Sequence, residues 1–310
     1  MKSYFVLGII AVLLVSGCVS QTGTPSTGSG AGYGLEITDF SVDQSEVFSG
    51  QSVHPTLTVE NLGQDVVSKS ASFALLIVPG DWNVISGPAG VMADKKVVKF
   101  TKNLDPENTV IGTQADSKIM TWTVKPEVDL EKGEQRTDTI FSKIYYDYET
   151  VSKGLVWIYP ESERTEDNKI TSTDTFTATR GPLDIDVSII PDPTVVEFAG
   201  ELLTVQILIT NIGDGTPYSP GQISAEHYSI SEDDRNNVTI NIIPKGTGTV
   251  LEKVDNSCET DVLLVNNKAT VMCDLNITSE VSVKQSYPLE IRVAYGYTTE
   301  EQTSVTVTGK

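Results

Sequence analysis

One stretch of this chain occurs twice, and that repeat limits how the chain can fold more than any other feature. Residues 46–65, EVFSGQSVHPTLTVENLGQD, return without a gap as residues 196–215, VEFAGELLTVQILITNIGDG. Apolar residues alternate with polar ones in both copies, which predicts a half-buried β-strand. Each run ends in Asn-x-Gly, residues that tolerate the positive φ of a tight turn. The sequence therefore predicts two copies of one β module, with these equivalent pairs: Phe48 and Phe198, Gly50 and Gly200, Asn61 and Asn211, Gly63 and Gly213.

Length and charge agree with two exported or soluble domains. The chain has 310 residues, the size of two ordinary domains, and no stretch shows sustained helical spacing. It carries 42 acidic and 22 basic residues, a net charge of -20. Because no basic stripe is present to neutralise phosphates, the sequence argues against a nucleic-acid partner. The acidic balance instead predicts a soluble, self-repelling surface.

The first 18 residues, MKSYFVLGIIAVLLVSGC, read as a secretory signal peptide. One lysine precedes an apolar run from Tyr4 to Val15 that is too short for a comfortable membrane span. Val15-Ser-Gly-Cys18 is similar to a lipobox, in which the cysteine is lipidated and becomes the mature N-terminus. We predict a lipid anchor on Cys18. The alternatives are an uncleaved N-terminal anchor and a signal peptide in which Cys18 is incidental, and all three readings place the remainder outside the cytoplasmic membrane.

Three segments are predicted after the signal peptide. Residues 19–34 are rich in Gly, Ser and Thr and are expected to form a flexible tether. Residues 35–180 form the first β-sandwich module, with residues 151–170 as an added hairpin or long loop. Residues 181–310 form the second module, joined to the first through the short, stiff pair Gly181-Pro182. The predicted fold class is all-β, with two tandem immunoglobulin-like sandwiches.

A paired Tyr-x-Tyr occurs late in each module. Tyr146 and Tyr148 correspond to Tyr295 and Tyr297. Because side chains two residues apart on a strand point to the same face, both rings of each pair are predicted to lie on one side of a sheet. The pattern favours a role in packing. Each module is predicted to end in a separate strand after its Tyr-x-Tyr pair; in the second module this strand is residues 303–308.

The order of several short motifs resembles a known group of proteins. Asn61-Leu-Gly63 is followed by Pro79-Gly-Asp-Trp82, then Trp122-Thr-Val124, and then Leu130-Glu-Lys-Gly133-Glu. The chain resembles the immunoglobulin-like repeats of prokaryotic, notably archaeal, surface lipoproteins: CARDB-type adhesion modules, NEW3-type modules and S-layer-associated repeats. The resemblance covers most of residues 35–310. It implies β-sandwiches that act as spacers or adhesion units without catalysis.

Two cysteines and two sequons lie in the second module. Cys258 and Cys273 enclose a predicted hairpin that turns at Asn266-Asn267. In an exported protein such a pair suggests a disulfide, and two buried thiols are the alternative. The triplets that begin at Asn237 and Asn276 fit N-glycosylation acceptors, although such triplets also arise by chance.

Candidate ligand contacts are few. Trp82 lies on a predicted loop, where it could stack on a sugar, but a tryptophan more often plugs the end of a sandwich. Calcium ligands could come from Asn61-x-Gly-x-Asp65, or from an acidic cluster. Neither has the regular spacing of a calcium loop, so a solvated loop is favoured and no metal site is predicted. The acidic cluster consists of Glu161, Glu163, Glu166 and Asp167.

No motif for catalysis or for cofactor binding occurs in the sequence. There are only two histidines, and no nucleophile elbow, phosphate loop or dinucleotide fingerprint is present. We therefore expect no enzyme activity and no cofactor. The leading hypothesis is a lipid-anchored surface protein whose modules project in series, for adhesion, envelope structure or assembly with a surface protein or glycan. Two alternatives remain: a carbohydrate- or peptide-binding lipoprotein, either alone or beside a transporter, and a polysaccharide-processing accessory with paired carboxylates in a cleft.

Overall fold

The computed structural model describes residues 33–164, 174–245, 250–254 and 258–310. The predicted all-β class is confirmed. Apart from two single turns of 3-10 helix, η1 (Lys69–Ala71) and η2 (Glu161–Glu163), every regular element in these ranges is a β-strand. None of the helices in the described part of the chain is long and apolar enough to cross a membrane.

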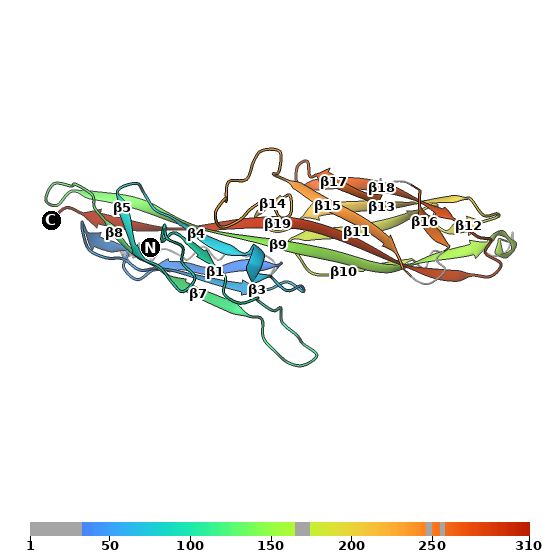
Figure 1. Cartoon of the computed structure of the whole chain (residues 1–310), viewed down its shortest axis with the longest axis horizontal. Coiled ribbons are helices and arrows are strands. Elements are labelled where there is room, and N and C mark those ends of the chain that lie inside the picture. Colours follow the sequence, from blue (N-terminus) through green and yellow to red (C-terminus); the bar gives the residue numbers. More distant parts are fainter. Residues whose placement is uncertain (1–32, 165–173, 246–249, 255–257) are drawn as a thin grey trace, which may run out of the picture.

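Two very long strands run through the molecule side by side (Figure 1). β9 (Gln135–Pro160) has 26 residues and β19 (Gln285–Thr308) has 24. They pair antiparallel from Gln135 opposite Thr308 to Ile158 opposite Gln285. At about 3.3 Å per residue, each strand extends roughly 80 Å. The prediction of separate, shorter strands near the two Tyr-x-Tyr pairs is therefore wrong, because each Tyr-x-Tyr pair lies within one uninterrupted strand.

The first sandwich covers one half of this long pair. One of its sheets has the order β1-β3-β7, and the opposing layer uses the N-terminal half of β9 and the C-terminal half of β19. A separate two-stranded ribbon, β5-β8, closes its far end. The elements are β1 (Leu35–Val42), β2 (Glu46–Phe48), β3 (Pro55–Asn61), β4 (Phe73–Ile77), β5 (Trp82–Ser86), β6 (Val97–Lys99), β7 (Ser117–Thr121) and β8 (Thr123–Pro126).

The second sandwich covers the other half with the same plan. Its covering sheet has the order β11-β13-β18-β16, and its opposing layer uses the C-terminal half of β9 and the N-terminal half of β19. The elements are β10 (Thr175–Ala178), β11 (Leu183–Ile190), β12 (Thr194–Val196), β13 (Leu202–Asn211), β14 (Thr216–Tyr218), β15 (Asn237–Pro244), β16 (Leu251–Lys253), β17 (Glu259–Leu263) and β18 (Lys268–Ile277).

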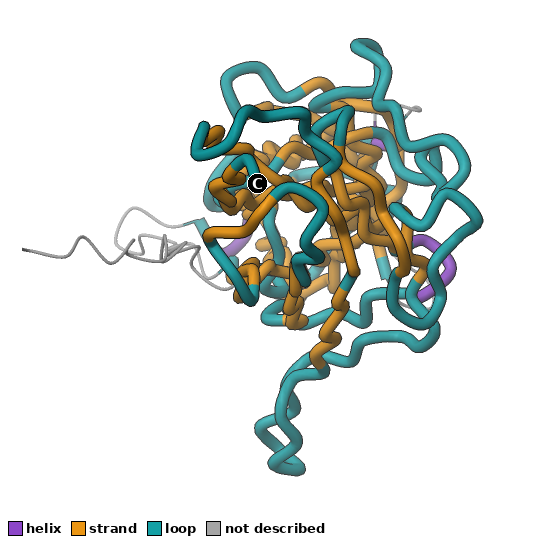
Figure 2. Tube along the Cα trace, turned by 90° about the vertical axis from the view of Figure 1, so that its left-hand side faces the viewer, coloured by secondary structure: helices purple, strands orange, loops and turns teal. Residues whose placement is uncertain are grey.

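The two sandwiches exchange a strand within one chain. β9 begins in the first sandwich and ends in the second, where β12 pairs parallel with its last residues. β19 begins in the second sandwich and ends in the first, where β2 pairs parallel with Thr306–Thr308. The division of the repeat at residues 180 and 181 is thus no division between sandwiches, since each sandwich is completed by residues from the other half. Their relative orientation depends on the shared strands as well as on Gly181-Pro182. Figure 2 shows the molecule along its long axis, with strands (orange) in the interior and loops (teal) around them.

Four tyrosines occupy the centre, where the long strands pass from one sandwich to the other. Tyr148 lies opposite Tyr295, and Tyr146 lies opposite Tyr297. Neighbouring ring centroids are 5.9 to 6.2 Å apart, within the range of favourable aromatic pairs. All four rings are buried on one face, as the Tyr-x-Tyr spacing predicted. Burial raises the pKa of Tyr146 and of Tyr295 well above that of an ordinary phenol.

The tyrosine hydroxyls connect this cluster to the two Asn-x-Gly turns. The main-chain N–H groups of Gln64 and Asp65 donate to the hydroxyl of Tyr148 at 2.9 and 3.0 Å. In the second half, the hydroxyl of Tyr297 accepts from the N–H of Gly215 and donates to Oδ1 of Asn211, each at 2.9 Å. In both halves, therefore, the Asn-x-Gly turn is hydrogen-bonded to a tyrosine of the central cluster.

The glycines of these turns are required for a reason other than the predicted one. Neither Gly63 nor Gly213 has positive φ, so that part of the prediction is wrong. A β-carbon at Gly63 would overlap the hydroxyl of Tyr148, and one at Gly213 would overlap the hydroxyl of Tyr297. Positive φ occurs instead at the other repeated pair, Gly50 (79°) and Gly200 (98°).

A substitution at one turn should test this contact. Gly213→Ala is expected to lower the free energy of unfolding by about 1–3 kcal/mol, because the new methyl group meets the hydroxyl of Tyr297. Adding Tyr297→Phe should recover part of the loss, since it removes the overlapping oxygen. Urea denaturation measures both effects. Gly80→Ala is the matched control, because nothing lies within 4 Å of a β-carbon there. Equal losses for Gly213→Ala and Gly80→Ala would contradict the explanation.

The strand exchange makes a second prediction, on local protection. Val305 is fully buried, and it belongs to the second repeat but packs in the first sandwich. Val305→Asp should therefore increase amide hydrogen exchange in residues 35–148 more than in residues 183–296, because a charge is buried in the first core. Thr303→Asp, at a half-exposed position of the same strand, is the control. Preferential loss of protection in residues 183–296 would contradict the exchanged arrangement.

Candidate binding site at the waist

A cleft of about 500 Å³ lies where the two sandwiches meet, and we call it the waist cleft. One wall is the start of β1, and the facing wall is the middle of β19. The turn after β13 contributes Gly213–Thr216, and the loop between β14 and β15 contributes Tyr228, Ile230 and Arg235. The cleft is thus built from segments far apart in the sequence.

The β19 wall includes an unpaired strand edge. On the side away from β9, β14 pairs with Thr298 and β2 pairs with Thr306. Among the described residues, no strand pairs with 299–305 on that side. The N–H of Thr306 and the C=O of Thr308 bond toward β2. Because main-chain direction alternates along a strand, Glu300, Gln302 and Ser304 present their main-chain groups to the same edge.

Carboxylates outnumber cations around the cleft. Glu300 forms an ion pair with Lys143 at 2.5 Å. Glu36, Asp214 and Glu301 form no ion pair with any described residue, and Arg235 is the remaining cation of the lining. Burial raises the pKa of Glu36, and the charge of Asp214 acts in the same direction. The site therefore has an excess of negative charge that a bound cationic group would neutralise.

Aromatic side chains add flat apolar surface to this acidic lining. Tyr33, Tyr145, Tyr228 and Tyr297 all contribute to the cleft. Tyr145 stacks on Phe73 with ring centroids 4.8 Å apart, and burial raises its pKa. Carboxylates together with tyrosine faces can hold a lysine or arginine side chain by ion pairing and by cation–π contact. None of these residues was predicted from the sequence to contact a ligand, and Tyr297 was noted only for packing, because the cleft depends on strand pairing that only the fold creates.

Trp82, the candidate ligand contact for which the sequence favoured packing, is not available to a ligand. It is only 4% exposed, and its indole N–H donates to Oδ2 of Asp138 at 2.8 Å. Arg136 bonds to the same carboxylate at 2.7 Å. The sugar-stacking interpretation is therefore wrong for Trp82, which closes the end of the first sandwich as the packing alternative predicted. Trp122 is also fully buried.

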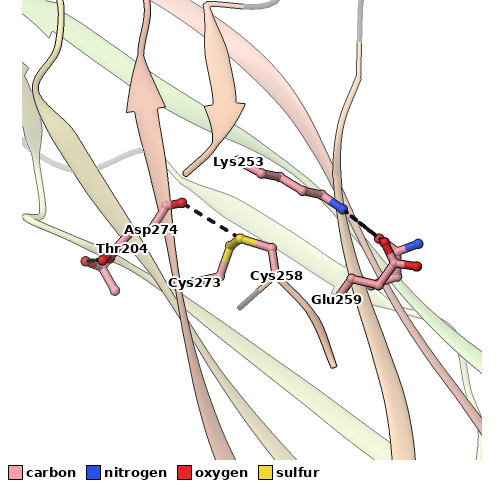
Figure 3. Close-up of a disulfide and its surroundings, with 7 residues drawn as sticks. Thr204, Lys253, Cys258, Glu259, Cys273 and Asp274 are labelled. Atoms are coloured by element: carbon pink, nitrogen blue, oxygen red, sulfur yellow. Dashed lines mark hydrogen bonds and ion pairs between the residues drawn. A yellow bond between two sulfur atoms is a disulfide. The ribbon is translucent and has the colours of Figure 1, made fainter. Parts of the chain in front are cut away.

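The structure joins Cys258 to Cys273 in a disulfide, the pairing that the sequence suggested (Figure 3). The predicted hairpin around it is wrong, since β17 pairs with β15 and β18 pairs with β13 and β16. Asn266 and Asn267 do form a turn with positive φ, but that turn crosses from one sheet to the other. The disulfide therefore ties the two layers of the second sandwich together. Closing a loop of this length stabilises a fold by about 3 kcal/mol.

The remaining sequence candidates have varied positions. Asn237 begins β15 and Asn276 lies near the end of β18, and both are half-exposed. Cys18 lies outside the described residues, as do Glu166 and Asp167 of the acidic cluster. Asn61 is buried, and its amide donates to the main chain of Asp65 and Leu104. This amide thus stabilises the turn. No group of three His, Cys, Asp or Glu side chains suited to a metal ion occurs in the described ranges.

Comparison with known proteins gives no family. No family model and no curated protein match the chain. Weak structural matches include red sea bream transglutaminase (11% identity, TM-score 0.17), covering 88% of this chain and 31% of that one. The secreted serine protease VesC of Vibrio cholerae matches at 9% identity and TM-score 0.18, covering 86% and 50%. The collagen adhesin of S. aureus matches at 10% and 0.14, covering 88% and 92%. The chain thus spans half or less of the first two proteins, and TM-scores this low carry no functional argument.

The environment of Glu36 predicts a pH-dependent stability. Its raised pKa means that its stabilising contribution is complete below the unfolded pKa, near about pH 4, and is lost as pH rises through the folded pKa. Glu36→Gln should therefore raise the melting temperature at about pH 7 and leave it unchanged below about pH 4. Exposed Glu107→Gln is the control. A pH-independent effect of Glu36→Gln would contradict this account.

Proposed function

We propose that the protein is a non-catalytic surface protein, anchored by lipid at Cys18, that holds a partner at its waist for adhesion or envelope assembly. The observation that carries this proposal is the strand exchange. Two strands of 24 and 26 residues cross the junction together, so we expect the sandwiches to behave as one rigid body. A rigid body of this kind suits a spacer or scaffold, and its fixed junction keeps the waist cleft in one shape.

The point where the chain enters the body changes how such a scaffold would stand on a membrane. Leu35 begins β1 beside the tyrosine cluster at the waist. A tether of about sixteen residues reaches roughly 20–25 Å, so the lipid would hold the body close to the surface by its middle. The two modules would then extend to either side of the attachment point. The sequence had instead predicted that they project from the membrane one after the other. The waist cleft would stand next to the attachment point.

Two further observations support a location outside the cytoplasm. The Cys258–Cys273 disulfide is of a kind that persists in oxidising compartments. The net charge of -20 favours a soluble body that does not adhere to acidic lipid headgroups. Together with the lipobox-like residues 15–18, they favour a protein attached to the outer face of the membrane through its lipid alone.

A second candidate function is ligand capture by a lipoprotein. Trp82 is buried and cannot be the contact, so the observation that favours ligand capture is the waist cleft, whose tyrosines and carboxylates could bind a sugar or a peptide.

The carboxylates of the waist cleft also allow a test of the polysaccharide-processing hypothesis. Incubation of residues 33–310 with cell-wall polysaccharides should release no reducing ends. Release that disappears in Glu36→Gln would replace the proposal with a hydrolase.

Anchoring is tested by a single substitution in the whole precursor. Cys18→Ser should move most of the protein from the membrane fraction to the soluble fraction or the medium, and should abolish incorporation of labelled fatty acid. The reason is that two acyl chains are needed for stable attachment. The double variant Cys258→Ser/Cys273→Ser is the control and should stay in the membrane. Cys18→Ser protein that remains membrane-bound would point to an uncleaved N-terminal anchor.

The partner role is tested on intact cells. Surface crosslinking followed by purification of the anchored protein should recover a defined surface protein or glycan. Replacing Glu36 and Glu301 with glutamine should reduce the yield of that product, whereas Glu107→Gln should not. Crosslinks that spread evenly over the exposed surface and respond to neither change would contradict a dedicated partner site.

A further inference from the structure

We infer that the edge of β19 beside the waist cleft is a docking slot for an extended peptide strand of a partner protein, one that carries a lysine or arginine. This inference deepens the proposed function by naming the chemical class of the partner. It rests on a comparison between the two halves of the molecule, which repeat the same plan but differ at this edge.

The second sandwich shows how the equivalent edge is filled. There β10 pairs antiparallel with β9, from Thr175 opposite Leu155 to Ala178 opposite Ser152. Ser152 lies four residues after Tyr148, and Glu301 lies four residues after Tyr297. The corresponding stretch of β19 is thus residues 301–304, within the edge that no described strand covers. Its main-chain donors and acceptors at Gln302 and Ser304 pair with no strand in the described part of the chain.

The side chains beside this edge show the same difference. Thr150 and Ser152, which face inward from β9, are both 0% exposed. Their counterparts on β19, Thr299 and Glu301, are only half-buried. On the filled side, the ring of Phe176 packs so tightly over Gly154 that no β-carbon fits there. The first sandwich therefore has a strand position with hydrogen-bonding groups and a lined cleft, and none of the described strands fills it.

The chain's own sequence is a poor filler for this position. Residues 27–30 precede Gly34 by the same distance as β10 precedes Pro182, and they read Thr-Gly-Ser-Gly where β10 has Thr-Phe-Thr-Ala. They supply no side chain that could pack as Phe176 does, and glycine is unfavourable in strands. A strand from another protein, with ordinary β-forming residues, would satisfy the edge better by β-augmentation.

Charge selects among such strands. A peptide that follows the register of β10 would place its C-terminal residues beside Thr299 and the wall formed by Glu36, Asp214 and Glu301. These three carboxylates form no ion pair with described residues, so a basic side chain there gains attraction without displacing a described cation. β10 itself is followed by Arg180. The preferred occupant is therefore an extended segment of alternating Thr and apolar residues with a basic end.

The test uses soluble residues 33–310 and two probes. One is a fluorescent peptide with the sequence of residues 175–180, Thr-Phe-Thr-Ala-Thr-Arg, and the other is a displayed library of random seven-residue peptides. We expect micromolar to millimolar binding, shifts in the amide resonances of Glu300, Gln302 and Ser304, and enrichment of basic sequences. A peptide with Glu in place of Arg should bind about tenfold more weakly at low salt.

Variants separate the slot from non-specific attraction. Gln302→Pro removes an edge donor where proline is tolerated, and it should weaken binding at least about tenfold relative to Gln302→Ala. If Gln302→Pro fails to fold, Glu301→Gln combined with Asp214→Asn tests the charge part and should weaken binding severalfold. Failure of both probes to perturb residues 299–305 would overturn the inference, as would binding that Gln302→Pro leaves unchanged.

The chain's own N-terminal segment is the competing occupant. If residues 19–310 fail to bind the probes while residues 33–310 bind them, that segment fills the slot and the partner proposal is wrong. Equal binding by both proteins supports an external strand. Because these measurements are made in solution, they do not depend on the lipid anchor. Loss of anchoring in the Cys18 test and loss of peptide binding here therefore refute different claims.

Discussion

The pairing of β9 with β19 along their whole lengths is the interaction on which the rest of the structure depends. Each strand supplies a wall to both sandwiches, so neither core is complete without residues from both halves of the chain. The tyrosine cluster sits at the crossing point and fills the space where the two covering sheets meet. Each aromatic pair contributes about 0.5–1.5 kcal/mol beyond its buried area, and the hydroxyls also hold the adjoining turns. The junction between the two sandwiches is thus packed like a protein core, unlike a flexible linker between domains.

The strands and turns that depend on neighbouring residues alone could be predicted from the local sequence pattern. The alternation in the repeat predicted β3 and β13, the Tyr-x-Tyr spacing predicted rings on one face, and Asn266-Asn267 predicted a turn. The continuity of the long strands was missed because their inward positions turn polar just after the tyrosines. Thr150 and Ser152 on β9, like Thr299 and Glu301 on β19, interrupt the apolar alternation without ending the strand.

The waist cleft could not be predicted for a different reason. Its walls come from β1, from the turn after β13 and from β19, and nothing in the sequence indicates that β19 returns to the first sandwich. The error on Trp82 has a similar origin. A tryptophan after Pro-Gly looks exposed on a loop, but β5 pairs with β8 and turns the indole toward Asp138. Both the position of the waist cleft and the burial of Trp82 depend on contacts between residues that are distant in the sequence.

The exchanged strands also constrain the order in which the molecule can form. β2 bonds to Thr306–Thr308, so this edge of the first sandwich cannot close until residues that lie far along the chain are in place. Contacts between such remote segments form slowly, because a long loop must be closed before they are made. A chain that is made from its N-terminal side onward would therefore keep the first sandwich open until β19 is available, although the strands that begin this sandwich are made early.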